Sequence, residues 1–249
     1  MSHRSAEAEG EDFKILGVTF DCELTMANAV HEVVVEVSWK LRTLARSASY
    51  HNDAQLVNLY KARVLGYVEY RTAAVYHATD TVLAPLNRVQ DSFLKRLGVE
   101  PLEALMEFRL APLATRRDMA MLGLVHRAAL RQGPPQFWEF FTVNPALTPS
   151  TTRLAQRRHA GQLVETRRGR FLEVVRRSAL GLVAVYNLLP PEVVQSKTVK
   201  RFQEQLQEQL KARARAGCED WPLTYSPRVP LWRHPLRWAE HLRQQTGSE

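Results

Sequence analysis

The sequence predicts a mainly α-helical protein, in which a short strand precedes a helical bundle and a basic, irregular C-terminal region with one further long helix follows it. Apolar residues recur at helical spacing over most of the first 131 residues, and strand-like runs are few. Beyond residue 141, prolines and arginines interrupt this periodicity. The 249-residue chain has 45% hydrophobic and 24% charged residues, which excludes a disordered or collagen-like protein.

Three regions follow from these patterns. Residues 1–12 are polar and aperiodic, which is typical of a disordered tail. Residues 13–141 hold the strand and a bundle of about five helices, and residues 142–249 form the basic C-terminal region.

A short strand is the first predicted element, because residues 13–20 are rich in β-branched and aromatic side chains. Gly17 within this run indicates a bulge or a close approach of another backbone segment. A single strand leaves its backbone N–H and C=O groups unsatisfied. The strand must therefore pair with another segment, and because the rest of the sequence offers few strand-like runs, we expect the chain to be incomplete.

Apolar stripes and breaking residues define the helices. Asn52 or Asp53 can cap the second helix, Gly98 ends the third, and Pro101 opens the fourth. The stripes predict five helices, over residues 30–44, 54–76, 80–97, 102–108 and 113–131. An aromatic turn follows at residues 136–141, residues 171–187 suit either helix or strand, and a polar helix extends from residues 196–198 to about 216.

Charge is distributed unevenly along the chain. Residues 1–125 carry 14 Lys and Arg against 16 Asp and Glu, whereas residues 126–249 carry 20 against 10. Such asymmetry indicates a polyanionic partner, most often nucleic acid, so we expect the backbone of RNA or DNA to bind the second half. The alternative is a solvated basic face that only keeps the protein soluble.

Eight arginines without any lysine form the strongest functional signal. The guanidinium group of arginine can donate two parallel hydrogen bonds to phosphate oxygens. This block therefore predicts a groove that follows a nucleic-acid backbone. The candidate phosphate-binding residues are Arg153, Arg157, Arg158, Arg167, Arg168, Arg170, Arg176 and Arg177. The alternative is a solvated loop, or local pairing with Glu165 and Glu173.

Two tryptophans near the C-terminus are candidates for base stacking. Trp232 and Trp238 lie among arginines, and such sets can stack on unpaired bases. The alternative is that this tail docks on its own domain.

Catalytic and metal-binding patterns are scarce. No two aspartates are adjacent, although two-metal phosphoryl transfer needs clustered carboxylates, and the acidic pairs Glu11-Asp12 and Glu219-Asp220 flank loops. A zinc set of Cys218, His234 and His241 has long gaps and a single cysteine. We therefore expect no catalytic residue, no metal site and no cofactor.

The remaining features concern the cellular compartment. The two cysteines, Cys22 and Cys218, exclude a disulfide framework, and the acidic N-terminus is unlike a signal peptide. No apolar run approaches the roughly 18–20 residues of a membrane span. We expect a nuclear or cytoplasmic protein that is neither secreted nor membrane-bound.

Several segments resemble, in order and spacing, the thumb and post-thumb region of non-LTR retrotransposon reverse transcriptases. The strand that follows the catalytic palm in that family resembles residues 13–21. Its later helices resemble Leu59-Tyr60-Lys61, Tyr67-Val68-Glu69-Tyr70 and Leu86-Asn87-Arg88-Val89-Gln90-Asp91. Its tryptophan-asparagine-x-leucine-proline element resembles Tyr186-Asn187-Leu188-Leu189-Pro190, followed by Phe202 and Leu206; Tyr186 replaces the usual tryptophan.

This resemblance implies a non-catalytic remnant that grips nucleic acid through backbone contacts. The family's Ala-Asp-Asp step would lie upstream of Phe13, and no residue here matches it, so the chain is a reverse transcriptase by descent only. A helical protein-interaction module without a nucleic-acid role is the alternative, because apolar stripes also suit a partner helix. The sequence distinguishes neither RNA from DNA nor one oligomeric state from another.

Overall fold

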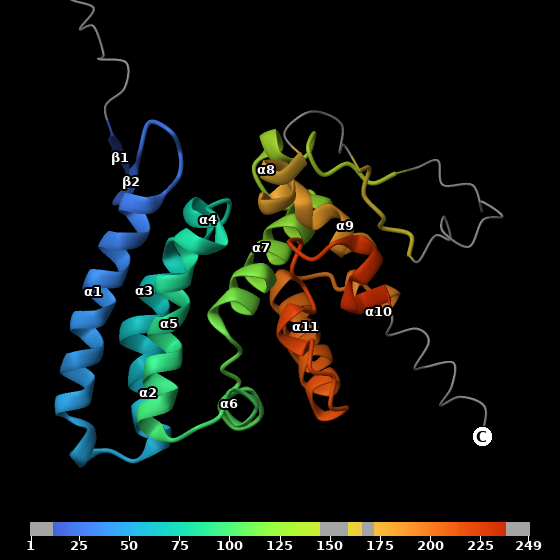
Figure 1. The fold of residues 1–249 in the computed structure, drawn as a ribbon. Coiled ribbons are helices and arrows are strands. Elements are labelled where there is room, and N and C mark those ends of the chain that lie inside the picture. Colours follow the sequence, from blue (N-terminus) through green and yellow to red (C-terminus); the bar gives the residue numbers. More distant parts are fainter. Residues whose placement is uncertain (1–11, 145–158, 166–171, 238–249) are drawn as a thin grey trace, which may run out of the picture. The chain divides into compact units, whose positions relative to one another are not determined.

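The computed structural model describes residues 12–144, 159–165 and 172–237 (Figure 1). This part is mostly helical with a two-stranded sheet near its start, which confirms the predicted fold class. The chain divides into two compact units, Met1–Phe93 and Leu94–Glu249. Packing thus divides the chain after residue 93, whereas composition places a boundary after residue 141. Within the described ranges, every helix is too short or too polar to be a transmembrane segment.

The N-terminal element is a hairpin of two strands, β1 (Phe13–Ile15) and β2 (Val18–Phe20), that pair in antiparallel fashion. Leu16 and Gly17 form the turn, with φ angles of 48° and 77°. Two consecutive positive φ values are typical of the type I′ turn, whose twist suits a two-residue hairpin loop. The prediction of a single strand over residues 13–20 was therefore wrong, because Gly17 marks a reversal of the chain, so that two strands form and each supplies the other's partner.

Asp21 connects the hairpin to helix α1 (Ala27–Arg46). Its carboxylate accepts hydrogen bonds from the N–H groups of Thr25 and Met26, both at 2.7 Å. Burial acts to raise the pKa of Asp21, but these N–H groups outweigh it and lower the pKa below its usual value. Met26 is fully buried with a φ of 63°, so the carboxylate holds a strained helix start in place.

The predicted second helix, over residues 54–76, is broken into several shorter pieces, whereas the third has the predicted bounds of residues 80–97. A capping box of Asn52 and Gln55 opens the second helix, as expected. A π-helical turn at Lys61–Leu65 then interrupts it. The elements that follow α1 are α2 (Asp53–Tyr60), α3 (Gly66–Tyr70), α4 (Thr72–Val75) and α5 (Asp80–Leu97).

Residues of α2 and α5 meet in the core of this unit. The rings of Tyr60 and Phe93 stack with their centroids 4.2 Å apart. The Tyr60 hydroxyl donates to Oε1 of the buried Gln90 at 3.5 Å. These residues therefore stabilise the packing of the first unit.

The second unit is built around two long helices that pack side by side, α7 (Leu113–Ala129) and α11 (Val199–Arg215) (Figure 1). Thr198 caps α11, which confirms the predicted polar helix. The ambiguous stretch at residues 171–187 is helical where the structure describes it. The other elements are α6 (Pro101–Phe108), α8 (Leu172–Arg177), α9 (Leu182–Asn187) and α10 (Pro191–Val194).

A fully buried histidine in α7 organises the core of this unit. Nε2 of His126 donates to the carbonyl oxygen of Ser196 at 2.8 Å, and Nδ1 accepts from the hydroxyl of Tyr186 at 2.9 Å. The imidazole also stacks on Phe202 with ring centroids 4.1 Å apart. Burial lowers the pKa of His126, while the bond to Ser196 acts in the opposite direction. The neutral ring thus joins α7, α9 and α11.

Candidate nucleic-acid interface

Most of the arginine block lies outside the described residues, namely Arg153, Arg157, Arg158, Arg167, Arg168 and Arg170. Within the described part, Arg176 and Arg177 are neighbours on α8. Arg176 forms an ion pair with Glu173, with nitrogen and oxygen 2.6 Å apart, which is the local pairing considered above. Arg177 forms no ion pair with a described residue.

The C-terminal tail divides into a buried part and an exposed part. Trp232 is 68% exposed, and the guanidinium of Arg233 lies 5.6 Å from its ring centroid. The next residues, His234, Pro235 and Leu236, are buried. Trp232 therefore offers a free aromatic face, whereas Trp238 lies outside the described residues.

His234 is positioned by its neighbours and is not arranged as a zinc ligand. Its Nε2 donates to the carbonyl oxygen of Ser226 at 3.2 Å, and its Nδ1 accepts from the N–H of Leu236 at 3.4 Å. Both ring nitrogens are thus occupied. Among the described residues, no three histidine, cysteine or acidic side chains cluster as metal ligands, and His241 lies outside this part.

The Glu219-Asp220 pair is not part of a carboxylate cluster among the described residues either. Asp220 forms an ion pair with Arg213, at 2.8 Å, and thereby ties the end of α11 to the segment that follows it. Glu11 of the other acidic pair lies outside the described residues.

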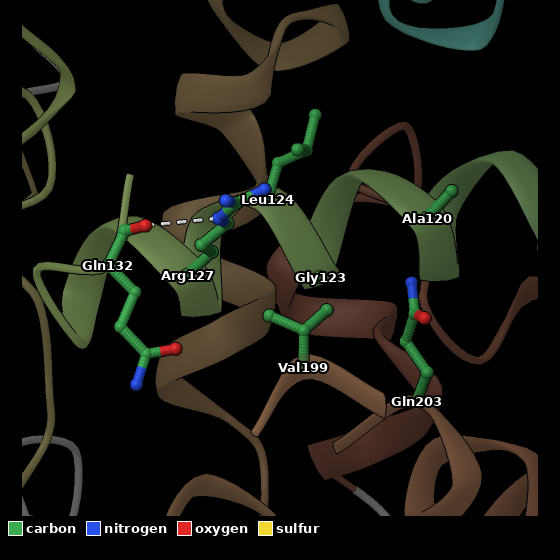
Figure 2. A pocket seen from close by; sticks show the side chains of 7 residues that line it. All are labelled: Ala120, Gly123, Leu124, Arg127, Gln132, Val199 and Gln203. Carbon is green, nitrogen blue, oxygen red and sulfur yellow. Dashed lines mark hydrogen bonds between the residues drawn. The ribbon is translucent and has the colours of Figure 1, made fainter. Parts of the chain in front are cut away.

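A pocket that the sequence reasoning missed lies between α7 and α11 (Figure 2). Its volume of about 440 Å³ is within the range of small-molecule sites, roughly 300–1,000 Å³. The residues that line it are Ala120, Gly123, Leu124, Arg127, Gln132, Val199 and Gln203.

Gly123 allows the two helices to approach closely beside this pocket. A Cβ atom at this position would lie 2.6 Å from Nε2 of Gln203 and 3.2 Å from Cγ1 of Val199. An isolated glycine inside a helical pattern can have such a packing reason, so Gly123 could have indicated a close approach on this face of α7, but not the residues that it meets.

Hydrogen bonds position two of the polar side chains at the pocket. Nε of Arg127 donates to the carbonyl oxygen of Gln132 at 3.1 Å, the bond drawn in Figure 2. Nε2 of Gln132 donates in turn to the carbonyl oxygen of Lys197 at 3.3 Å. The Gln203 carboxamide is half-buried and forms no hydrogen bond with the described residues. The pocket thus combines apolar walls with a fixed cation and an available amide.

Four exposed cations, which we call the basic rim, either line the pocket or lie within two residues in sequence of a residue that lines it. They are Arg127, Arg131, Lys197 and Lys200. In the described part of the chain, none of them forms an ion pair with an acidic side chain. The Arg131 guanidinium lies 6.0 Å from the ring centroid of Trp138, which adds an aromatic group beside the rim. The basic rim is therefore available to an external anion.

The Tyr186-Asn187 motif serves the fold and does not form a site. The side chain of Asn187 accepts from the N–H of Leu163 at 2.8 Å and donates to its carbonyl oxygen at 2.9 Å. The carbonyl oxygen of Tyr186 accepts from Nε2 of His159 at 3.1 Å. Both residues therefore hold the described segment at residues 159–165 against the core.

In comparisons with known proteins, no family model, curated protein or solved structure matches this chain. The functional assignment rests on the residues of the site.

Proposed function

We propose that this chain binds the backbone of RNA or DNA without catalysing a reaction on it. The observation that carries this proposal is the basic rim: Arg127 lines the pocket, the other three exposed cations lie within two residues in sequence of lining residues, and none has an acidic partner in the described part of the second unit. The arginine block adds eight further cations on the same half of the sequence. Phosphate groups bound by such residues release their counterions, which makes the affinity depend on salt.

The order of the segments shared with non-LTR reverse transcriptases supports the same role. We propose that the chain descends from the thumb and post-thumb region of that family and retains its grip on the nucleic-acid backbone. Three residues of these segments, Tyr60, Gln90 and Tyr186, are buried. They support the proposed descent only indirectly, because they stabilise the folded core on whose surface the cations lie.

Salt-dependent binding tests the proposal. Replacement of Arg127, Lys197 and Lys200 by Gln removes three rim charges, and we expect the log–log salt slope on duplex DNA to become shallower by about 2–3. Fluorescence anisotropy at several salt concentrations measures this slope. An additional variant with Arg157, Arg158, Arg167 and Arg168 replaced by Ala tests the arginine block in the same way.

A matched control removes as many exposed charges from the first unit. The variant with Arg42, Arg46 and Arg88 replaced by Gln has the same net charge as the rim variant. It should retain the affinity and the slope of the parent chain, because the proposed interface lies in the second unit. Equal slopes for the parent, the rim variant and the arginine-block variant would contradict the proposal.

The second candidate function is docking of a partner protein, and one observation favours it. Val35 and Trp39 are 54% and 58% exposed, and their spacing of four places them on one face of α1. Such an apolar face suits a partner helix. This candidate would take precedence if the basic-rim and arginine-block variants bind nucleic acid as tightly as the parent chain.

A further inference from the structure

We infer that the pocket between α7 and α11 accepts one unpaired base of a single strand, so that the protein binds single strands more tightly than backbone contacts alone would allow. This inference rests on the proposed backbone binding and adds a substrate class to it. It concerns the pocket lined by Gly123, Arg127, Gln132, Val199 and Gln203 (Figure 2).

The lining of the pocket suits a planar, heteroaromatic group. Ala120, Leu124 and Val199 provide apolar surface, while the carboxamide of Gln203 can both donate and accept a hydrogen bond. None of the residues that line the pocket is acidic. A base needs this combination, because its faces are apolar and its edge carries donors and acceptors.

Arg127 offers a surface on which a base can stack. Its Nε–H bond to the carbonyl oxygen of Gln132, at 3.1 Å, restrains the guanidinium plane at the edge of the pocket. Bases stack on such planes in single-strand complexes. The restraint reduces the side-chain entropy that binding would otherwise remove.

The basic rim decides between a nucleotide and an apolar peptide as the occupant. Lys197 is tied to the pocket through the bond from Gln132, and Lys200 follows the pocket residue Val199 directly. The Gln132 bond reaches the backbone carbonyl of Lys197, so these two exposed lysines bring positive charge to the neighbourhood of the pocket, which suits an occupant that carries phosphates. An uncharged peptide segment would leave these cations, and Arg131, without a partner.

The test compares strands that differ only in their bases. The probes are a single-stranded DNA of mixed sequence, the same strand with abasic sites throughout its central part, and a duplex of the same length. We expect the full-length protein to bind the intact strand about fivefold more tightly than the abasic strand, because one stacked base contributes about that much.

Two substitutions of glutamine residues test whether the pocket causes this preference for the intact strand. Gln203→Leu keeps the size of the side chain but removes the amide, and it should reduce the preference for the intact strand, because the edge of the base loses its hydrogen-bond partner, while stacking on Arg127 and the salt slope stay unchanged. Gln195→Leu is the matched control, because Gln195 is exposed and does not line the pocket. It should keep the preference of the parent chain.

The outcomes separate this inference from the proposed function. Equal affinity of the parent protein for intact and abasic strands, with normal salt dependence, would overturn the inference and leave backbone binding intact. A preference that is as large in Gln203→Leu as in the parent protein would also overturn it. Absence of salt-dependent binding to all three probes would instead reject the proposed function itself. The comparison of strands on the parent protein stands even if Gln203→Leu fails to fold.

Discussion

Two buried histidines in the second unit are held in their neutral form by the groups around them. At His126 the hydroxyl of Tyr186 donates to Nδ1, and a proton on that nitrogen would oppose this donor. At His234 the N–H of Leu236 occupies Nδ1 in the same way. Protonation of either ring would place a charge in a site that offers it no acidic hydrogen-bond partner among the described residues.

His234 should make the stability of the second unit depend on pH. Burial lowers its pKa to about 4; the bond to Ser226 acts in the opposite direction, and the nearby Arg213 charge lowers the pKa further. In the unfolded chain a histidine titrates near 6.5, so the unfolded state binds more protons between pH 6.5 and 4. The stabilisation is complete above pH 6.5 and falls by on the order of 3 kcal/mol as the pH approaches 4.

Urea unfolding at pH 7.5, 6, 5 and 4 checks this dependence. A His234→Gln variant should lose much of the pH dependence, because an amide does not titrate in this range. His31, which is exposed on α1, is the control, and His31→Gln should behave as the parent chain does. If His234→Gln and the parent show the same decrease in unfolding free energy, buried His234 is not its source.

At the scale of elements, the joint between the hairpin and α1 depends on one side chain. Asp21→Ala removes the acceptor for the N–H groups of Thr25 and Met26, and we expect unfolding free energy to fall by about 1–2 kcal/mol, as for the loss of a helix cap. Thermal unfolding followed by circular dichroism measures the loss. Glu23→Ala is the control, because Glu23 is exposed and should change stability little. Equal losses in both variants would show that the carboxylate does not anchor α1.

The helices themselves follow local rules, but their interruptions do not. Asn52 and Thr198 cap their helices as the sequence indicates, because capping depends on residues within one turn. The π-helical turn at Lys61–Leu65 has no comparable local signal. Tyr60, Val64 and Val68 are nevertheless all buried, so the core-facing side of the chain continues through this interruption.

At the scale of the molecule, the parts of the chain before and after Gly98 differ in net charge. Residues 1–98 carry 11 Lys and Arg against 12 Asp and Glu, whereas residues 99–249 carry 23 against 14. A cut after Gly98 leaves α5 whole, since that helix ends at Leu97. We expect residues 99–249 to retain salt-dependent nucleic-acid binding and residues 1–98 to show none at about 0.1 M salt, where exposed charges act only over about 10 Å.

Anisotropy titrations of the two fragments measure this difference, and circular dichroism verifies that each is helical. Binding of residues 1–98 with the affinity of the whole chain would place the interface in the first unit. The prediction depends on net charge and on the basic rim, and it holds for RNA and DNA alike because phosphate contacts carry no sequence information.

The amino-acid sequence by itself determined the helical class, the positions of the long helices and the concentration of positive charge in the second half. These properties depend on neighbours three or four residues apart or on composition, so they can be read without a structure. The same local reasoning identified Gly17 as a bulge or a close approach of another backbone segment and did not identify the turn, because the choice between these depends on which strand pairs with which.

Only the tertiary structure decided the candidate pocket and the state of His126. The pocket joins Gly123 and Arg127 of α7 to Gln203 of α11, and the His126 imidazole bonds to a carbonyl oxygen 70 residues away. Such contacts arise when two helices pack, and a glycine or histidine in a helical pattern carries no record of the distant residue that it meets. Long-range packing determines which distant residue each side chain contacts. It therefore also determines how deeply the side chain is buried, its protonation state and whether a ligand can reach it.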